Sequence, residues 1–159
     1  MSQPKREWLS LIGFLVICYL VEAAAGAITA LNVDSWYPSI TKPSWNPPEW
    51  VFGPVWTALY TFMGFAAWGV WLQRHQKPVK LALTLFFAQL FLNGLWSFLF
   101  FGFHWLGVAM VELFLLWCAI LATILAFWQV EKRAGILLIP YLLWVSYAFA
   151  LNVAIWWLN

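Results

Sequence analysis

The chain has 159 residues, of which 65% are hydrophobic and only 9% are charged, and its formal net charge is +2. Soluble domains carry about a quarter charged residues, so this composition excludes an ordinary water-soluble fold. The small net charge gives no reason to expect a nucleic-acid partner, and no phosphate loop, zinc signature or nucleophile elbow is present in the sequence. The length predicts one domain over residues 1–159.

Five apolar segments follow one another along the chain. As α-helices rising about 1.5 Å per residue, they would each reach roughly 33 to 36 Å, enough to cross a hydrocarbon core of about 30 Å. The sequence therefore predicts an all-α polytopic membrane protein, a bundle of five transmembrane helices. The predicted spans are residues 9–31, 50–73, 81–102, 106–128 and 135–157.

The basic residues predict how this bundle is oriented. With five spans, the N-terminus and the second and fourth connections share one side, and that side carries every Lys and Arg except Lys42. The positive-inside rule then predicts a cytoplasmic N-terminus and an external C-terminus. A rival interpretation makes residues 5–21 a signal peptide, but the apolar character continues to Leu31. The seven residues on the cytoplasmic side are Lys5, Arg6, Arg74, Lys77, Lys80, Lys132 and Arg133.

The first connection, residues 32–49, is long for a link between neighbouring helices and contains four prolines. Proline restricts the unfolded loop and so lowers the entropy cost of ordering it, and long loops in compact proteins are commonly functional. We predict that this loop, with Trp36, Tyr37 and Trp45, folds over the outer end of the bundle as a lid. The alternative is an aromatic loop that lies on lipid headgroups.

Tryptophan is unusually frequent, with 14 residues in the chain. Most suit the membrane interfaces, where amphipathic rings are enriched, but several are predicted deep within spans. Counted from the outer ends, a set of aromatic and polar residues in the second, third and fifth spans falls at one depth, roughly 9 to 20 Å below the outer face. Spacings of three or four place neighbours on one helix face. We predict an aromatic pocket there, against the alternative of ordinary core packing. The set comprises Trp56, Tyr60, Asn93, Trp96, Trp144 and Ala148.

Two acidic residues, Glu22 and Glu112, fall inside predicted spans. Because a charge in hydrocarbon costs several kcal/mol, we expect each to be protonated or hydrogen-bonded to a neighbouring helix, with proton transfer as the alternative. The two histidines, His75 and His104, are predicted at opposite membrane faces and cannot share a metal ion. No metal site is expected.

Specific motifs run through most of the chain. The most distinctive is Lys42-Pro43-Ser44-Trp45-Asn46-Pro47-Pro48, which Trp36-Tyr37 precedes and the block from Trp50 to Tyr60 follows. On these residues the chain resembles the translocator protein (TspO/MBR) family, whose members are also called tryptophan-rich sensory proteins or peripheral benzodiazepine receptors. The likeness continues at Gln89, Leu92-Asn93, Phe100-Phe101-Gly102, Pro140-Tyr141-Leu142-Leu143-Trp144, Ala148 and Leu151-Asn152.

The resemblance implies a five-helix membrane receptor or sensor-type protein with a regulatory role in tetrapyrrole or stress response. Its ligands would be porphyrins such as protoporphyrin and haem, and other flat hydrophobic molecules, with no required cofactor. A homodimer through the third span is also implied. Two alternatives stay open, a tetrapyrrole or sterol transporter and a light-dependent porphyrin-degrading enzyme with Trp56 and Trp144 as photochemical candidates. Carried over by motif, the implied ligand contacts are Tyr37, Pro47, Trp56, Tyr60, Asn93, Trp96, Trp144 and Ala148.

The chain departs from the animal members of this family near its C-terminus. The segment after Leu151-Asn152 reads Val153-Ala154-Ile155-Trp156-Trp157, without the tyrosine and arginine of their cholesterol-recognition pattern. Sterol binding through that pattern is therefore not expected. No mitochondrial presequence is recognisable, and we expect a bacterial cytoplasmic membrane.

Overall fold

The computed structural model describes residues 3–159, and side chains from Glu7 onward. Lys5 and Arg6, which contribute to the predicted orientation, lie outside the described side chains. All regular elements among the described residues are helical, and five helical stretches are long and apolar enough to cross a membrane. The predicted all-α five-span fold is confirmed. The stretches are Glu7–Val33, Glu49–Leu72, Lys80–Gly102, Leu106–Val130 and Lys132–Leu158.

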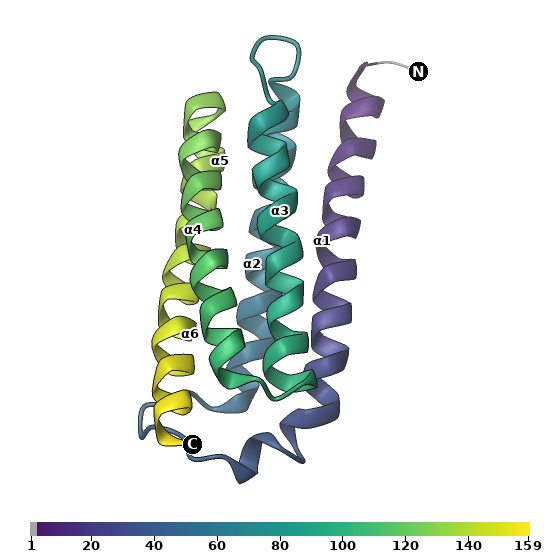
Figure 1. Ribbon diagram of the computed structural model, residues 1–159. Helices are drawn as coiled ribbons and strands as arrows, with labels where there is room; N and C mark the ends of the chain where they lie inside the picture. Colours follow the sequence, from purple (N-terminus) through teal and green to yellow (C-terminus); the bar gives the residue numbers. More distant parts are fainter. Residues whose placement is uncertain (1–2) are drawn as a thin grey trace.

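The helices lie side by side along one axis, with the N-terminus at one end of the bundle and the C-terminus at the other (Figure 1). Helix α1 packs on α2 and α3, α3 packs on α4, α4 packs on α6, and the short α5 packs on α2 and α4. Apolar side chains on nearly every face suit lipid surroundings, where a helix satisfies its own backbone polar groups. The bounds are α1 Gln3–Val33, α2 Phe52–Leu72, α3 Lys80–Ser97, α4 Leu106–Val130, α5 Lys132–Leu137 and α6 Ile139–Leu158.

Two spans are less regular than the sequence predicts. The third span ends in a π-helical turn, η3 (Phe98–Gly102), and the fifth is divided at Leu138 into α5 and α6. Pro140 lies in the first turn of α6, where its missing N–H removes no helical hydrogen bond. Proline therefore allows a new helix to begin there.

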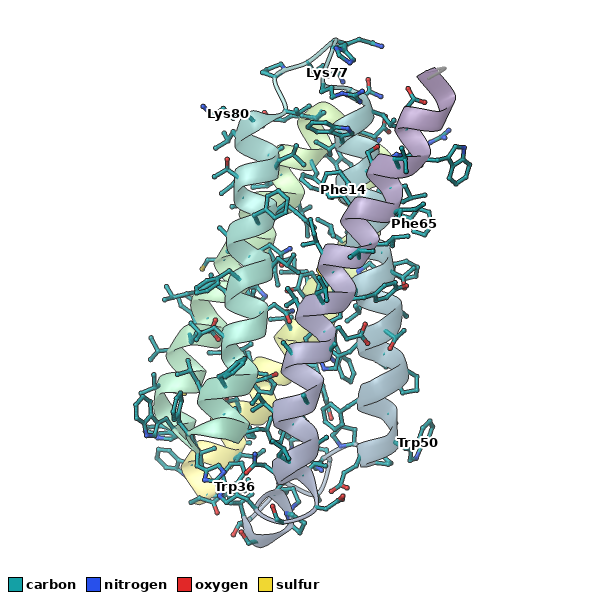
Figure 2. All side chains as sticks on the ribbon, turned by 90° about the vertical axis from the view of Figure 1, so that its right-hand side faces the viewer. Phe14, Trp36, Trp50, Phe65, Lys77 and Lys80 are labelled. Carbon is teal, nitrogen blue, oxygen red and sulfur yellow. The ribbon has the colours of Figure 1, made fainter. Side chains whose placement is uncertain are left out.

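Most basic residues gather at the end opposite the loop, called the charged end below, as Lys77 and Lys80 show in Figure 2. The Lys77 ammonium donates to the carbonyl oxygen of Val130, so the second and fourth connections meet. Trp36 and Trp50 lie at the other end. The basic residues therefore lie mainly at one end of the bundle. That this end faces the cytoplasm stays a prediction.

Buried apolar side chains form two clusters rather than one. The larger cluster fills the bundle toward the charged end and includes Met63, Phe86 and Phe127. The smaller cluster lies beneath the loop and comprises Tyr37, Phe100, Phe101, Ala109, Leu151 and Ile155. Most members of the smaller cluster, together with Tyr60 of the larger one, line the cavity described next.

Candidate ligand-binding cavity

A cavity of about 450 Å³ lies in the loop half of the bundle, between α1, α2, α3 and α6. Pockets for small organic ligands are typically about 300–1,000 Å³ and mostly apolar, and this cavity meets both criteria. Its wall from α2, α3 and η3 is rich in aromatic rings, and its wall from α6 contributes Ala148, Leu151, Asn152 and Ile155.

Helix α1 forms the wall with the smallest side chains. Ala25, Gly26 and Ala30 line the cavity, and a Cβ atom added at Gly26 would meet nothing within 4 Å. Glu22 belongs to the same wall, and the Thr57 hydroxyl of α2 donates to its Oε1 at 2.5 Å. Helix α1 thus contributes both the smallest side chains of the cavity wall and a carboxyl group.

Two aromatic pairs, one from α2 and one from α3 and η3, line the cavity. The ring centroids of Trp56 and Tyr60, both on α2, lie 5.9 Å apart, and their planes are tilted by 40°. The Trp96 ring of α3 stacks on Phe100 at 5.0 Å and 27°. Such offset aromatic pairs are rigid and present both faces and edges to a guest. The two pairs therefore offer a flat apolar molecule rigid aromatic surface.

A buried hydrogen-bond network lies at the floor of the cavity. The Tyr60 hydroxyl donates to Oδ1 of Asn93 at 2.5 Å, and Nδ2 of Asn93 donates to the Tyr141 hydroxyl at 2.6 Å. Tyr141 in turn donates to Oε1 of Gln89 at 2.9 Å. The Asn93 amide is thereby satisfied within the protein, and its role is to fix the floor and align Tyr60.

The loop closes the end of the cavity through Tyr37, which is 3% exposed and lines it. Its hydroxyl donates to Oδ1 of Asn46 at 2.8 Å. Burial is the main cause that raises the pKa of Tyr37 to about 12, while the Asn46 hydrogen bond opposes it. The Lys42 ammonium lies 4.6 Å from the centre of the Tyr37 ring and donates to the Tyr37 carbonyl oxygen at 2.6 Å. Lys42 is therefore part of the loop's own structure.

The loop is attached to the bundle at three places. Trp36 stacks on His104 with ring centroids 4.0 Å apart, next to the α3–α4 connection. The Tyr147 hydroxyl of α6 donates to the Trp45 carbonyl oxygen at 2.8 Å. Near the C-terminus, Thr41 and Asn159 exchange two hydrogen bonds of 2.9 Å. These contacts hold the loop across the end of the bundle, as seen at the foot of Figure 1.

Comparison with known proteins identifies this architecture. The TspO/MBR family matches residues 14–158. The chain belongs to the TspO/MBR family. It is 41% identical over 155 residues to the tryptophan-rich protein TspO of Chlorobaculum tepidum, covering 97% of this chain and 98% of the relative. It is also 37% identical over 155 residues to the translocator protein of Sus scrofa, covering 94% and 89%.

A third relative also matches this chain along most of its length. The tryptophan-rich sensory protein of Cereibacter sphaeroides is 38% identical over 146 residues, which cover 92% of this chain and 89% of the relative. The predicted resemblance is confirmed over nearly the whole chain. This TspO/MBR protein is thus a multi-pass membrane protein of the sensor and translocator type.

Six of the eight ligand contacts expected for this TspO/MBR protein line the one cavity: Tyr37, Trp56, Tyr60, Asn93, Trp96 and Ala148. Pro47 and Trp144 do not belong to the described lining. The Trp144 ring stands edge-on behind Trp56, with centroids 6.5 Å apart, and its buried Nε1 has no hydrogen-bond partner among the described residues. Ligand contact by all eight residues stays a prediction.

The α1 wall is where the sequence prediction falls short. We expected a pocket lined by the second, third and fifth spans, but α1 contributes Glu22, Ala25, Gly26, Thr29, Ala30 and Val33. The signal was present as a run of small residues on α1, but small residues in a membrane helix equally indicate close packing against a neighbour. Whether these small residues of α1 pack closely or border a cavity depends on where α2 and α6 lie, which the sequence does not give.

The two acidic residues inside the spans have different surroundings. Glu22 has the expected hydrogen bond to a neighbouring helix, from Thr57. Glu112 of α4 does not, because both of its carboxyl oxygens are buried without a hydrogen-bond partner among the described residues. Of the two states expected for Glu112, the hydrogen bond to a neighbouring helix is therefore not found among the described residues.

Proposed function

We propose that this TspO/MBR protein is a membrane receptor or sensor-type protein that binds porphyrins, such as protoporphyrin and haem, and related flat hydrophobic molecules, with a regulatory role in tetrapyrrole or stress response. The observation that carries the proposal is the aromatic cavity of about 450 Å³ within the membrane-spanning helices. A tetrapyrrole offers a large apolar face, and burial of that face against indole and phenol rings supplies most of the binding free energy. The proposed contacts are Tyr37, Pro47, Trp56, Tyr60, Asn93, Trp96, Trp144 and Ala148.

The test is to fill the cavity and measure porphyrin binding. Ala148 lines the cavity from α6, so Ala148→Phe puts a ring where the ligand would lie, and we expect affinity for protoporphyrin to fall at least about tenfold, a change of about 1.4 kcal/mol. Binding is followed by the absorbance shift of protoporphyrin titrated into protein in lipid nanodiscs. This readout does not depend on the tryptophans of the protein.

The matched control is Ala58→Phe. Ala58 is exposed on α2 and lies outside the cavity lining, so the same added ring faces lipid and affinity is expected to stay within about twofold. Equal affinities of the two variants would contradict the assignment of the cavity as the binding site.

Light-dependent porphyrin breakdown is a second candidate function, favoured by one observation. Trp56 lines the cavity and Trp144 packs against it, so an excited porphyrin could take an electron from Trp56, which Trp144 would then re-reduce, leaving a reduced porphyrin and an oxidised Trp144 radical. Illumination of the complex should then bleach the porphyrin absorption faster in the wild type than in Trp144→Phe. Equal rates after subtraction of uncatalysed bleaching would remove this candidate.

Assembly and location complete the proposal. A shallow apolar groove between α1 and α3 includes Leu90, Phe91 and Gly94, which supports the expected homodimer through the third span. The gathering of basic residues at the end opposite the loop supports a cytoplasmic N-terminus and an external C-terminus, and the membrane we propose is a bacterial cytoplasmic membrane. Cysteine cross-linking and accessibility labelling test these two points directly.

A further inference from the structure

Several hydroxyl side chains of the helices are satisfied by their own backbone. Thr29 of the cavity wall donates to the carbonyl oxygen of Ala25 at 3.0 Å, and Thr123 of α4 donates to that of Ala119 at 2.7 Å. The carbonyl group four residues earlier is a common local partner of a helical hydroxyl. Ser97, the last residue of α3, departs from this pattern. It is only 7% exposed, yet its hydroxyl has no hydrogen-bond partner among the described residues.

The Ser97 hydroxyl is open to the cavity, because Ser97 belongs to the cavity lining. Among the buried and half-buried side chains that the structure describes, the fully buried polar atoms without a partner belong to Glu112 and Trp144 alone. The oxygen of Ser97 is therefore reached from the cavity. A polar group in apolar surroundings is costly without a partner. A ligand that brings a hydrogen-bond acceptor to Ser97 gains a bond that the protein itself does not make.

A second free donor in the wall is the indole N–H of Trp56. Trp56 lines the cavity, and its Nε1 has no hydrogen-bond partner in the part of the chain that the structure describes. This atom is not among the fully buried ones either. Trp96 differs, because its N–H donates to Oδ1 of Asn152 at 3.2 Å. The wall thus holds two unused donors, one on α2 and one on α3.

The two donors lie at one level of the cavity. The bond from the Tyr60 hydroxyl to Asn93 joins α2 and α3 at the floor. Helix α2 runs away from the loop and α3 runs back toward it (Figure 1). Trp56 precedes Tyr60 by four residues and Ser97 follows Asn93 by four, so each lies about 6 Å nearer the loop on the same helix face as its neighbour at the floor.

We propose that Ser97 is a specificity-determining contact of the cavity: its hydroxyl, at the level of the Trp56 N–H, donates to a carbonyl or carboxyl oxygen on a side arm of the ligand. The inference rests on the proposed function, because it names the chemical group that this part of the same cavity recognises. The propionate arms of protoporphyrin and haem carry such oxygens. The aromatic rings bind the flat face, and a few placed polar groups fix its orientation.

The experiment compares three porphyrins that differ in their side arms. Protoporphyrin carries two propionates, its dimethyl ester keeps the carbonyl oxygens without the charge, and etioporphyrin carries alkyl arms only. Each is titrated into protein in nanodiscs of zwitterionic lipid, with protein-free nanodiscs as the correction for partition into lipid. We expect Ser97→Ala to lower affinity for the acid and the ester about fivefold and to leave etioporphyrin within about twofold. Because the ester is uncharged, repulsion by the Glu22 carboxyl group of the wall does not affect its comparison with etioporphyrin.

Two further variants assign the effect to the hydroxyl. Ser97→Thr keeps the hydroxyl, so the ratio of ester to etioporphyrin affinity should stay that of the wild type. Ser146→Ala is the matched control, because Ser146 is exposed on α6 outside the lining and its hydroxyl already donates to the Leu142 carbonyl oxygen at 2.8 Å. All three affinities should stay within about twofold in this control. Without ligand, Ser97→Ala should unfold at the same temperature as the wild type, because no hydrogen bond within the protein is lost.

The outcomes separate this inference from the proposed function. A ratio of ester to etioporphyrin affinity that is unchanged in Ser97→Ala would overturn the role of Ser97, while binding of the ester by the wild type would leave the proposed function standing. A lower unfolding temperature of unliganded Ser97→Ala would show that the hydroxyl has a partner inside the protein, and would also overturn the inference. If the wild type binds none of the three porphyrins, the proposed function fails and the inference fails with it.

Discussion

The α1–α2 pair differs between its two halves, and glycine marks the difference. In the half near the charged end, a Cβ added at Gly64 would lie 2.6 Å from Cδ2 of Leu15. In the half near the loop, a Cβ added at Gly26 or Gly53 would meet nothing within 4 Å, and both residues line the cavity. Gly64 thus permits close helix contact in one half, whereas Gly26 and Gly53 border open space in the other; Gly13, exposed on α1 in the packed half, meets nothing within 4 Å either.

The large aromatic side chains follow the same division. Phe14 of α1 packs against Trp71 and Phe86 with ring centroids 6.3 Å apart in each case, so rings fill the packed half. Trp56 and Trp96 instead border the hollow half. A long loop joins α1 to α2 at the hollow end, which allows these helices to separate there without straining the connection. Stability thus resides mainly in one half and the candidate binding function in the other.

The largest expected effect is at the boundary between the halves, at Asn93. Asn93→Leu removes the acceptor of the Tyr60 hydroxyl and a donor to Tyr141, both buried. Leaving a buried polar group without its partner costs about 1–3 kcal/mol per group. We expect a marked loss of free energy of unfolding, measured by denaturation in mild detergent with a titrated denaturing detergent.

The double variant sharpens this prediction. Adding Tyr60→Phe to Asn93→Leu removes one of the stranded hydroxyls, and the paired apolar replacement should recover part of the lost stability. A double variant less stable than Asn93→Leu would show that the network does not act through unsatisfied groups.

A smaller effect is expected from glycine replacement in the two halves. Gly64→Val forces the added side chain into Leu15, and overpacking of this kind costs about 1–3 kcal/mol. Gly26→Val is the matched change in the hollow half and should cost less than about 0.5 kcal/mol, while reducing porphyrin affinity. Thermal unfolding of both variants measures the difference, and equal losses would contradict the division into a packed and a hollow half.

The smallest effect concerns the loop, through the Tyr37 phenol. Tyr37→Phe loses the hydrogen bond to Asn46, which we expect to cost about 0.5–1.5 kcal/mol at neutral pH. Burial raises the folded-state pKa of Tyr37 to about 12 from 10.0, so the folded state favours the neutral phenol. The phenol's stabilising contribution is then complete below pH about 10 and is lost as pH rises toward about 12.

Unfolding midpoints of the wild type and Tyr37→Phe between pH 7 and 11 test this sign. The two proteins should converge as the pH rises above about 10. A difference that grows with pH would mean that the phenol ionises more readily in the folded loop than in the unfolded chain.

The sequence predicted the fold well because whether a segment crosses the membrane depends on its own length and composition. Length and apolar composition fix that a segment such as 106–128 crosses the bilayer, and no neighbour needs to be known. The division of the fifth span at Leu138 was not predicted, although Pro140 was visible. Proline permits a helix to begin but also occurs within membrane helices, so the preceding residues decide through their packing on α2 and α4.

The candidate site was only partly readable from the sequence. Tyr60, Asn93 and Ala148 could be grouped because depth along a helix follows from residue counting. Whether Trp144 faces the cavity or stands behind Trp56 depends on the rotation of α6, and counting along a chain does not give that angle. The α1 wall was missed for the same reason, because the small residues around Gly26 fit close contact and open space equally.

The amino-acid sequence by itself determined the five membrane-spanning helices, the concentration of basic residues at one end and the membership of the TspO/MBR family, since each depends on residues read in order. Only the tertiary structure decided where the helices touch and where they part. That choice is made by side chains from different helices competing for one volume, and it places Leu15 against Gly64 and an open space beside Glu22.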